Sequence, residues 1–397
     1  MSNLDKKDLK NWLQSRQDYI LRQLNRWCSI NTHSFNISGI NEFLKVFLED
    51  AKELNADIQH HDLANFSCIS LSGKPEICSF APAITLTKRP NAKKKVLLCI
   101  HSDTVYAVND GFLKCELLDH NTLKGPGVAD AKGGLQVLLT GLLAYERFCP
   151  NENLGWTILL VPDEEIGSMG SFKLTQNLAK NHHIGLVFEP ALPDGNLVSS
   201  RPGSIVIRLM ATGKAAHAGR ELEKGINAIT ALSHLITHIN THKHRFDGNF
   251  NIGVIKGGTA VNQVPDYAVC ELNFRSNDLN KMQQVKQLLN DFISDIQGLH
   301  MAEFSIHHYC ERPPKILDHD SYVLYKQLQI CAKQQGLNIS WKSSFGVSDA
   351  NYMSSIGLAT LDTLGPVGGN LHSHQEYVKL SSILERSELL CRFLHTF

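Results

Sequence analysis

Apolar runs of strand length alternate with longer helical stretches over the first 200 residues of the chain. The runs are Val96 to Ile100, Thr157 to Val161 and Gly185 to Phe188, and a helical stretch such as Gly134 to Phe148 lies between two of them. Strands that are apolar on both sides belong in a sheet covered by helices on both faces. The pattern therefore predicts an α/β domain with helices on both faces of a mixed, mostly buried sheet.

From about Gly203 the pattern changes to alternation with a period of two. It appears at residues 205–210 and again at 270–275, with an amphipathic helix predicted for 226–239 between them. After Pro314 the first rhythm returns. We therefore predict a small α+β unit inserted into the larger one, which makes the domains 1–201 with 314–397, and 202–313.

Composition adds few further constraints. The length of 397 residues suits two or three domains. Because 39 basic residues balance 39 acidic ones, no long-range field attracts nucleic acid or an anionic membrane. No signal-peptide core or membrane-length apolar run is visible, and the ten cysteines form no CxxC pair. We expect a cytoplasmic protein with buried thiols and neither nucleic acid nor membrane as partner.

Charged residues follow each predicted strand of the first domain. They belong to five segments: HSDTV at 101–105, GPGVADAKGG at 125–134, DEEIGS at 163–168, FEP at 188–190 and GGNLHSHQEY at 368–377. Ligands bind at the carboxyl ends of the strands in open α/β sheets, so His101, 163–165 and Glu189 should converge there.

His101 and Asp103 should project from the same side of the extended chain. A carboxylate at Asp103 can then hold the imidazole and fix its tautomer, as carboxylate partners of metal-binding histidines do. Alternatively, Asp103 caps the following turn.

Asp130 follows a glycine-rich loop and comes just before a predicted helix. Such an Asp is often an N-cap. It also suits a carboxylate that bridges two cations about 3.5 to 4 Å apart, because both of its oxygens are accessible at a loop end.

Glu164 and Glu165 are adjacent and should point in different directions. One of them can bind metal while the other takes a proton from water whose pKa the cations lower towards about 7. An acidic surface turn is the alternative.

In their order and spacing, these five segments resemble the co-catalytic two-zinc peptidase family that includes glutamate carboxypeptidase, succinyl-diaminopimelate desuccinylase, acetylornithine deacetylase and aminoacylase. The resemblance covers nearly the whole chain. It is strongest to glutamate carboxypeptidase, because GVSDAN, LGPVGG and the HSxxEY spacing are similar to its carboxyl-terminal third.

The resemblance implies a catalytic, zinc-peptidase-like domain and two Zn²⁺ per subunit, with Co²⁺ or Mn²⁺ as substitutes. One ion would bind His372, Glu165 and Asp130, and the other His101, Glu189 and Asp130, with Glu164 as the base. The resemblance points to His372 rather than His374 as the ligand, and it also implies a cis peptide bond after Asp130. Ala131 departs from the bulky or acidic residue that the family often has there.

For the inserted unit, the resemblance implies a lid and dimerisation domain that contacts substrate through His217, Asn262 and Arg275. Arg275 suits a carboxylate, and His217 and Asn262 can donate to an oxyanion. In the family this histidine comes from the partner subunit, so a homodimer is expected.

These expectations describe a metal-dependent hydrolase that cuts an amide bond beside a free carboxylate. The first choice is a carboxypeptidase acting on short peptides or acyl-glutamates, and the alternative is an N-acyl-amino-acid deacylase. A non-catalytic binding protein is a third reading, although none of the implied ligands nor the base is missing from the chain.

Overall fold

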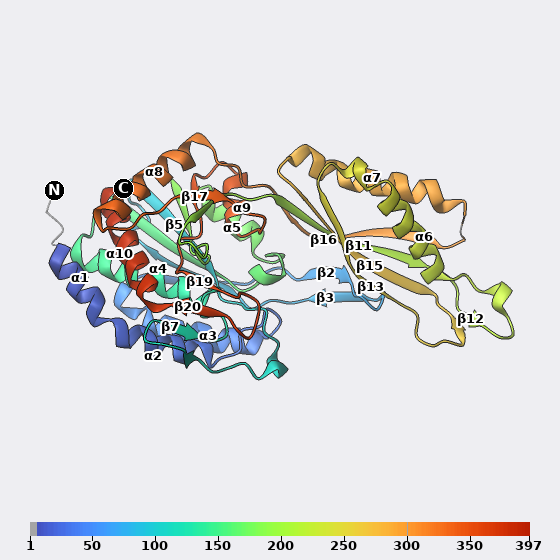
Figure 1. The fold of residues 1–397 in the computed structure, drawn as a ribbon, viewed down its shortest axis with the longest axis horizontal. Coiled ribbons are helices and arrows are strands. Elements are labelled where there is room, and N and C mark those ends of the chain that lie inside the picture. Colours follow the sequence, from blue (N-terminus) through green and yellow to red (C-terminus); the bar gives the residue numbers. More distant parts are fainter. Residues whose placement is uncertain (1–5, 300) are drawn as a thin grey trace. The chain divides into compact units, whose positions relative to one another are not determined.

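The computed structural model describes residues 6–299 and 301–397, which form two compact units (Figure 1). Unit 1 contains the described residues up to Ala64, together with Ser79–Arg201 and Lys315–Phe397. Unit 2 contains Asn65–Cys78 and Pro202–Pro314. Residues 65–78 were predicted to belong to the first domain, whereas the structure packs them with unit 2.

Unit 1 is built on a six-stranded sheet in the order β1-β4-β8-β5-β9-β18. β1 and β4 run antiparallel to their neighbours, and the other four strands are parallel. The predicted mixed sheet is therefore confirmed. The strands are β1 (Asp57–His61), β4 (Ala83–Lys88), β5 (Lys94–His101), β8 (Leu154–Val161), β9 (Ile184–Val187) and β18 (Thr360–Leu361).

Helices cover both faces of this sheet, as predicted. Leu98 and Ile100 on β5 belong to the large apolar cluster with α4 and α10, whereas Leu97 and Cys99 belong to a second cluster with α5 and α9. The helices of unit 1 are α1 (Lys6–Ser15), α2 (Gln17–Cys28), α3 (Ile37–Asp50), α4 (Lys132–Phe148), α5 (Phe172–Ala179), α8 (His319–Gln334), α9 (Ala350–Ser355) and α10 (Leu380–Thr396).

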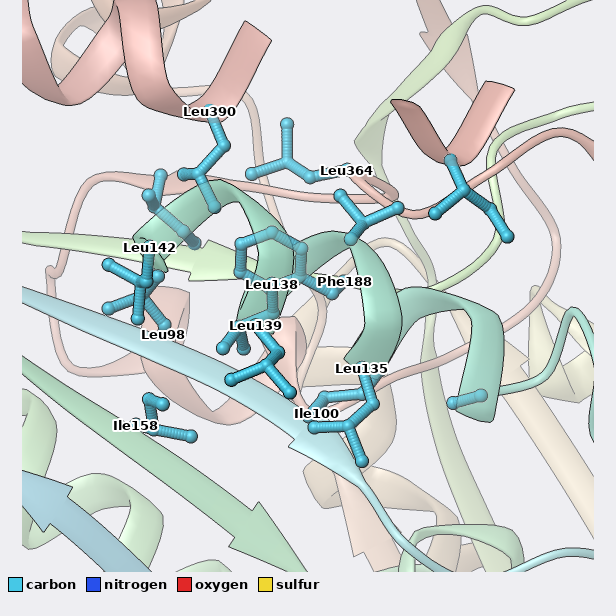
Figure 2. Packing of buried hydrophobic residues seen from close by; sticks show 14 of the residues in the cluster. Leu98, Ile100, Leu135, Leu138, Leu139, Leu142, Ile158, Phe188, Leu364 and Leu390 are labelled. Carbon is cyan, nitrogen blue, oxygen red and sulfur yellow. The ribbon is translucent and has the colours of Figure 1, made fainter. Parts of the chain in front are cut away.

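Helix α4 lies between the sheet and α10 and is apolar nearly all round, which is typical of a buried helix. Figure 2 shows its leucines packed between Ile100 on the sheet and Leu390 on α10. A Cβ at Gly134 would lie 2.0 Å from the backbone oxygen of Phe188. The glycine thus allows the first turn of α4 to lie directly against the end of β9.

Smaller sheets complete unit 1. β19 (Gly368–Gly369), β20 (Tyr377–Lys379), β7 (Thr122–Lys124) and β6 (Glu116–Leu117) form one sheet in that order. β10 (Leu197–Ser200) pairs in parallel with β17 (Trp341–Ser343). The first of these sheets brings the carboxyl-terminal segment next to the glycine-rich loop that precedes α4.

Unit 2 is an antiparallel sheet in the order β13-β15-β11-β16, with α6 and α7 packed on one face. The Asn227 side chain accepts a hydrogen bond from Thr230 N, so α6 begins at Ala228, two residues later than predicted. The elements are β11 (Gly203–Thr212), β13 (Asn249–Gly257), β15 (Tyr267–Ser276), β16 (Glu303–Arg312), α6 (Ala228–Thr241), α7 (Leu279–Gln297), and the short pair β12 (Ala216–His217) and β14 (Gln263–Val264).

The hairpin of β2 (Phe66–Ile69) and β3 (Pro75–Cys78) belongs to unit 2 because side chains of the four-stranded sheet of that unit hold it. Arg208 on β11 donates a hydrogen bond to the backbone oxygen of Ile69. The rings of Phe66 and Tyr309 contact each other at 5.8 Å between centroids. Within the described residues, no helix is both long and apolar enough to cross a bilayer.

Candidate metal centre

Candidate ligands lie at the carboxyl ends of three neighbouring parallel strands of the six-stranded sheet, β8, β5 and β9. His101 is the last residue of β5, and Glu189 follows β9 by two residues. Glu164 and Glu165 lie in a short 3₁₀ helix, Glu164–Ile166, just after β8. Because these strands share a direction, their carboxyl ends meet, and the structure brings the four side chains together.

The two carboxylate oxygens of Asp130 face two different imidazoles. Oδ1 lies 3.0 Å from Nε2 of His101, and Oδ2 lies 3.4 Å from Nε2 of His372. The Asp130–Ala131 peptide bond is cis, as the resemblance implies. The two oxygens of Asp130 are thus directed to different histidines.

Each imidazole also faces a glutamate. Nε2 of His372 lies 3.3 Å from Oε2 of Glu165, and Nε2 of His101 lies 3.8 Å from Oε1 of Glu189. Ligand atoms of His101, Asp130 and Glu165 lie within 4.8 Å of one another, and so do those of His101, Glu164 and Glu189.

His372 lies in the loop between β19 and β20 and has a φ of 60°, in the left-handed region. Strained backbone of this kind persists where the surroundings enforce it, often at functional sites. The ring of His374 instead stacks on Phe112, with 4.8 Å between centroids. Of the two histidines, the structure brings His372 to the other candidate ligands. We call this group the acidic cluster; it consists of His101, Asp130, Glu164, Glu165, Glu189 and His372.

Asp103 connects His101 to the two glutamates. Nδ1 of His101 lies 3.0 Å from the Asp103 backbone oxygen, which can only accept, so Nδ1 carries the hydrogen and Nε2 faces the cluster. The side-chain oxygens of Asp103 accept hydrogen bonds from the backbone N–H groups of Glu164 and Glu165, each at 3.1 Å. The hydrogen bond to His101 thus comes from the Asp103 backbone, whereas the carboxylate predicted to hold the imidazole lies 3.4 Å from Nδ1 and binds the turn at Glu164 and Glu165.

The donor set and its spacing fit divalent cations. Two imidazole nitrogens and four carboxylates are the groups that Zn²⁺, Co²⁺ and Mn²⁺ accept in proteins. A tetrahedral ion with bonds of about 2.0–2.2 Å separates its ligand atoms by about 3.3–3.6 Å. The distances of 3.3 Å and 3.4 Å around His372 agree with that spacing.

Burial and neighbouring charges raise the pKa values of several side chains in this cluster, so these side chains hold protons more tightly. Hydrogen bonds with Asp130 and Glu165 raise the pKa of His372 to about 11. Burial alone would lower the pKa of His101, but Asp103 and Asp130 raise it well above its usual value. Burial also raises the pKa of Glu165 and of Glu189. A cation that enters the cluster must therefore displace protons.

Glu376 was not among the residues predicted from the sequence, and it is buried behind the Asp130 loop. Its carboxylate accepts hydrogen bonds from the backbone N–H groups of Gly127, Ala129 and Asp130 at 3.1, 2.8 and 3.0 Å, and from the Tyr106 hydroxyl at 2.5 Å. Burial raises the pKa of Glu376 to about 7. The only sequence signal was its place in the HSxxEY spacing, which gives no indication of its partners.

Two of the three residues expected to contact substrate lie side by side in unit 2. His217 pairs with Gln263 across the β12–β14 ladder, and the backbone oxygen of Asn262 accepts a hydrogen bond from Ala218 N at 3.0 Å. The His217 side chain is exposed.

Arg275 lies at the far end of β15, eight residues beyond Tyr267 and so about 27 Å along an extended strand. Its Nε donates to Oδ1 of Asn273 at 2.9 Å. Burial, and then the charge of Arg312, lower the pKa of the guanidinium. Within unit 2, the structure does not bring Arg275 to His217.

The chain is similar in sequence to known proteins over most of its length. A sequence model described as Peptidase family M20/M25/M40 matches residues 97–396. That range contains every residue of the acidic cluster.

Individual relatives cover most of the chain. Carboxypeptidase G2 of Pseudomonas sp. (strain RS-16) is 28% identical over 306 residues, which are 76% of this chain and 73% of the relative. Acetylornithine deacetylase of Proteus mirabilis (strain HI4320) is 25% identical over 326 residues, with 76% and 79% covered. The solved dipeptidase Dug1p of Saccharomyces cerevisiae shares the fold, with a TM-score of 0.76, 14% identity and coverage of 100% and 98%.

Proposed function

Because this chain belongs to peptidase family M20/M25/M40, we propose that it is a carboxypeptidase that cuts an amide bond next to a free carboxylate in short peptides or acyl-glutamates. Membership confirms the resemblance inferred from the motifs and makes the chain a metallopeptidase or amidohydrolase. The substrate class, the use of two zinc ions and the residue roles below are the proposal.

The observation that carries the proposal is the orientation of Asp130 between two imidazoles. Oδ1 lies beside His101, which also faces Glu189, and Oδ2 lies beside His372, which also faces Glu165. Each side then offers one imidazole and one carboxylate in addition to Asp130, which is a complete three-ligand set for one ion.

We assign two Zn²⁺ to these sets, with Co²⁺ or Mn²⁺ as substitutes. When bound, the ions supply polarisation of the scissile carbonyl and lower the pKa of nearby water. Asp103 holds His101 in the tautomer that leaves Nε2 available.

Glu164 acts as the general base. Its neighbour Glu165 is directed to His372, whereas Glu164 lies with His101 and Glu189 and is buried to 8% exposure. The Glu164 carboxylate takes a proton from the attacking water and delivers it to the leaving amine. A buried position keeps bulk water away from that transfer.

The residues of unit 2 bind the rest of the substrate. Arg275 pairs with the free carboxylate through its guanidinium fork, and His217 and Asn262 donate to the oxyanion. In a homodimer through this unit, His217, together with Asn262 beside it, would serve the site of the partner subunit.

An open sheet edge supports such a homodimer. β13 is an edge strand of the unit 2 sheet, and among the described residues its second side has no neighbouring strand. Ile255 on this strand is 55% exposed. An uncovered edge of this kind is a ready pairing surface for a second copy. Sedimentation equilibrium should give twice the mass of one chain, and a monomer at micromolar concentration would exclude the dimer.

The decisive experiment combines metal analysis with a substrate panel. Purified protein loaded with zinc should contain two ions per chain and should hydrolyse dipeptides and acyl-glutamates with a free carboxylate. Protein that takes up no divalent ion and hydrolyses none of these would instead fit a non-catalytic binding protein on the same fold.

The second candidate is an N-acyl-amino-acid deacylase. It is favoured by the similarity to acetylornithine deacetylase, which covers 76% of the chain. Both reactions can use the same residues and differ in the pocket for the acyl side. A panel of acetyl-amino acids beside the dipeptides separates them, since the better substrates should fall in one set.

A further inference from the structure

Glu376 links the two loops that carry the candidate ligands Asp130 and His372. It lies four residues after His372 on the loop between β19 and β20, and its carboxylate reaches into the loop before α4. Gly125 N in that loop also donates to the Glu376 backbone oxygen at 3.1 Å. The side chain and backbone of one residue therefore hold both loops together.

The loop before α4 needs such an acceptor. Residues 126–130 are in turns rather than in a helix or strand, so the N–H groups of Gly127, Ala129 and Asp130 have no ladder partner. Buried N–H groups without an acceptor are strongly unfavourable. A carboxylate that accepts a hydrogen bond from each of the three N–H groups satisfies them. Successive backbone N–H groups bind anions in the same way in other proteins.

The contacts select a carboxylate over an amide. Oε1 accepts from Ala129 N and Asp130 N, and Oε2 accepts from Gly127 N and the Tyr106 hydroxyl. All four partners donate to Glu376. A glutamine would place its NH₂ group against either the first pair or Gly127 N, so at least one backbone N–H would lose its acceptor.

Tyr106 fixes the position of Glu376 in turn. Its hydroxyl lies 2.9 Å from the backbone oxygen of Ser373, next to His372, as well as 2.5 Å from Glu376 Oε2. The ring packs edge-on against Phe112, with 5.1 Å between centroids. Tyr106 therefore fixes the position of Glu376 relative to the loop that carries His372.

We propose that Glu376, held by Tyr106, is a positioning residue that sets the spacing between Asp130 and His372 and so determines the affinity for the ion that these two ligands share. The inference rests on the proposed function, because it takes Asp130 and His372 as ligands. Glu376 touches neither ion nor substrate and acts through the backbone of Asp130.

The test is a Zn²⁺ titration of the metal-free full chain by calorimetry, with Glu376→Gln compared with wild type. Changes in the partners that orient metal ligands typically weaken metal binding about 10- to 100-fold, and we expect a loss of that size for one of the two ions. The visible spectrum of the Co²⁺ form should change, because the geometry at that ion is altered. An unaltered spectrum together with wild-type affinity for both ions would overturn the proposal.

Glu146→Gln is the matched control. Glu146 is also a largely buried carboxylate that accepts several hydrogen bonds, from Arg89 and from Nε1 of Trp156 at 2.8 Å. It lies in the last turn of α4, about 21 Å along the helix from its first residue, Lys132. We expect this variant to lower the melting temperature and to leave both zinc affinities unchanged.

The melting temperatures separate positioning from structural support. A merely structural Glu376 would lower the melting temperature of the metal-free protein without changing zinc affinity, and that result would also overturn the proposal. If Glu376→Gln does not fold, Tyr106→Phe takes its place with a smaller loss expected, and unchanged affinity there counts against the proposal. Failure of the wild type to bind zinc would contradict the proposed function itself.

Discussion

Nδ1 of His101 lies 3.0 Å from the backbone oxygen of Asp103 and 3.4 Å from its Oδ1, so Asp103 fixes the imidazole from the side opposite the acidic cluster. The same carboxylate binds the N–H groups of Glu164 and Glu165 and the Ser34 hydroxyl. One buried side chain therefore orients a candidate ligand and the turn that carries the candidate base.

Asp103→Asn should weaken zinc binding about 10- to 100-fold, because the amide NH₂ faces groups that donate and so cannot replace every hydrogen bond. Calorimetric titration of the metal-free protein measures the effect. Asp50→Asn is the control, since Asp50 is also a mostly buried carboxylate and accepts from Trp27 Nε1 at 2.8 Å. Equal zinc affinities in wild type and Asp103→Asn would contradict the assigned role.

Glu164→Gln and Glu165→Gln should have different effects although the residues are adjacent. Loss of a general base lowers turnover about 10²- to 10⁴-fold, so Glu164→Gln should be nearly inactive while it retains two zinc ions. Glu165→Gln should instead lose zinc, because Glu165 faces His372. Zinc content and kcat are measured on both proteins, and a Glu164→Gln enzyme with substantial turnover would show that another group is the base.

Zinc binding should release protons at neutral pH. With its pKa raised to about 11, His372 is protonated in the metal-free protein at pH 7, and zinc can bind only the neutral ring. The affinity should therefore fall as the pH is lowered and rise as it is increased. Calorimetry in buffers of different ionisation enthalpy measures the protons released, and a value of zero at pH 7 would refute the expectation.

Arg275→Met should reduce kcat/KM about 10- to 100-fold for substrates with a free carboxylate, since a hydrogen bond to a charged group contributes about 1.5–3 kcal/mol. Analogues in which that carboxylate is amidated should be cut equally by both proteins. Arg208→Met is the control, because Arg208 binds Glu271 in the same sheet. A similar loss on both substrate types would mean that Arg275 supports the fold and does not bind the carboxylate.

Lys315→Met should change how stability depends on pH. Burial lowers the pKa of Lys315 from 10.5 to about 8, so between these values the folded state binds fewer protons than the unfolded state. The free energy of unfolding of the wild type should therefore rise relative to the variant from pH 8 to 10.5, by on the order of 3 kcal/mol. Urea unfolding of both proteins gives this difference, with the exposed Lys342→Met as control. A difference that is constant with pH would contradict the prediction.

The sequence allowed β8, β5 and β9 of the six-stranded sheet to be predicted, because each of them contains an uninterrupted apolar run, whereas β1, β4 and β18 were not predicted. Leu97 and Cys99 face one core cluster, and Leu98 and Ile100 face the other, so the run is apolar at every position. The helices on both faces follow from that pattern. The hairpin of residues 65–78 carries no comparable signal, because it is held to unit 2 by the contacts of Arg208 and Tyr309.

The sequence by itself determined the residue types at the strand ends, and with them the acidic cluster and the family. Only the tertiary structure decided which way each side chain faces. The contact of Gly127 N with Glu376 spans 249 positions, and the loops that hold Asp130 and His372 have no repeating geometry. Spacing predicts direction only where the backbone is regular. In loops, direction is set by hydrogen bonds between distant segments, and these exist only once the chain has folded.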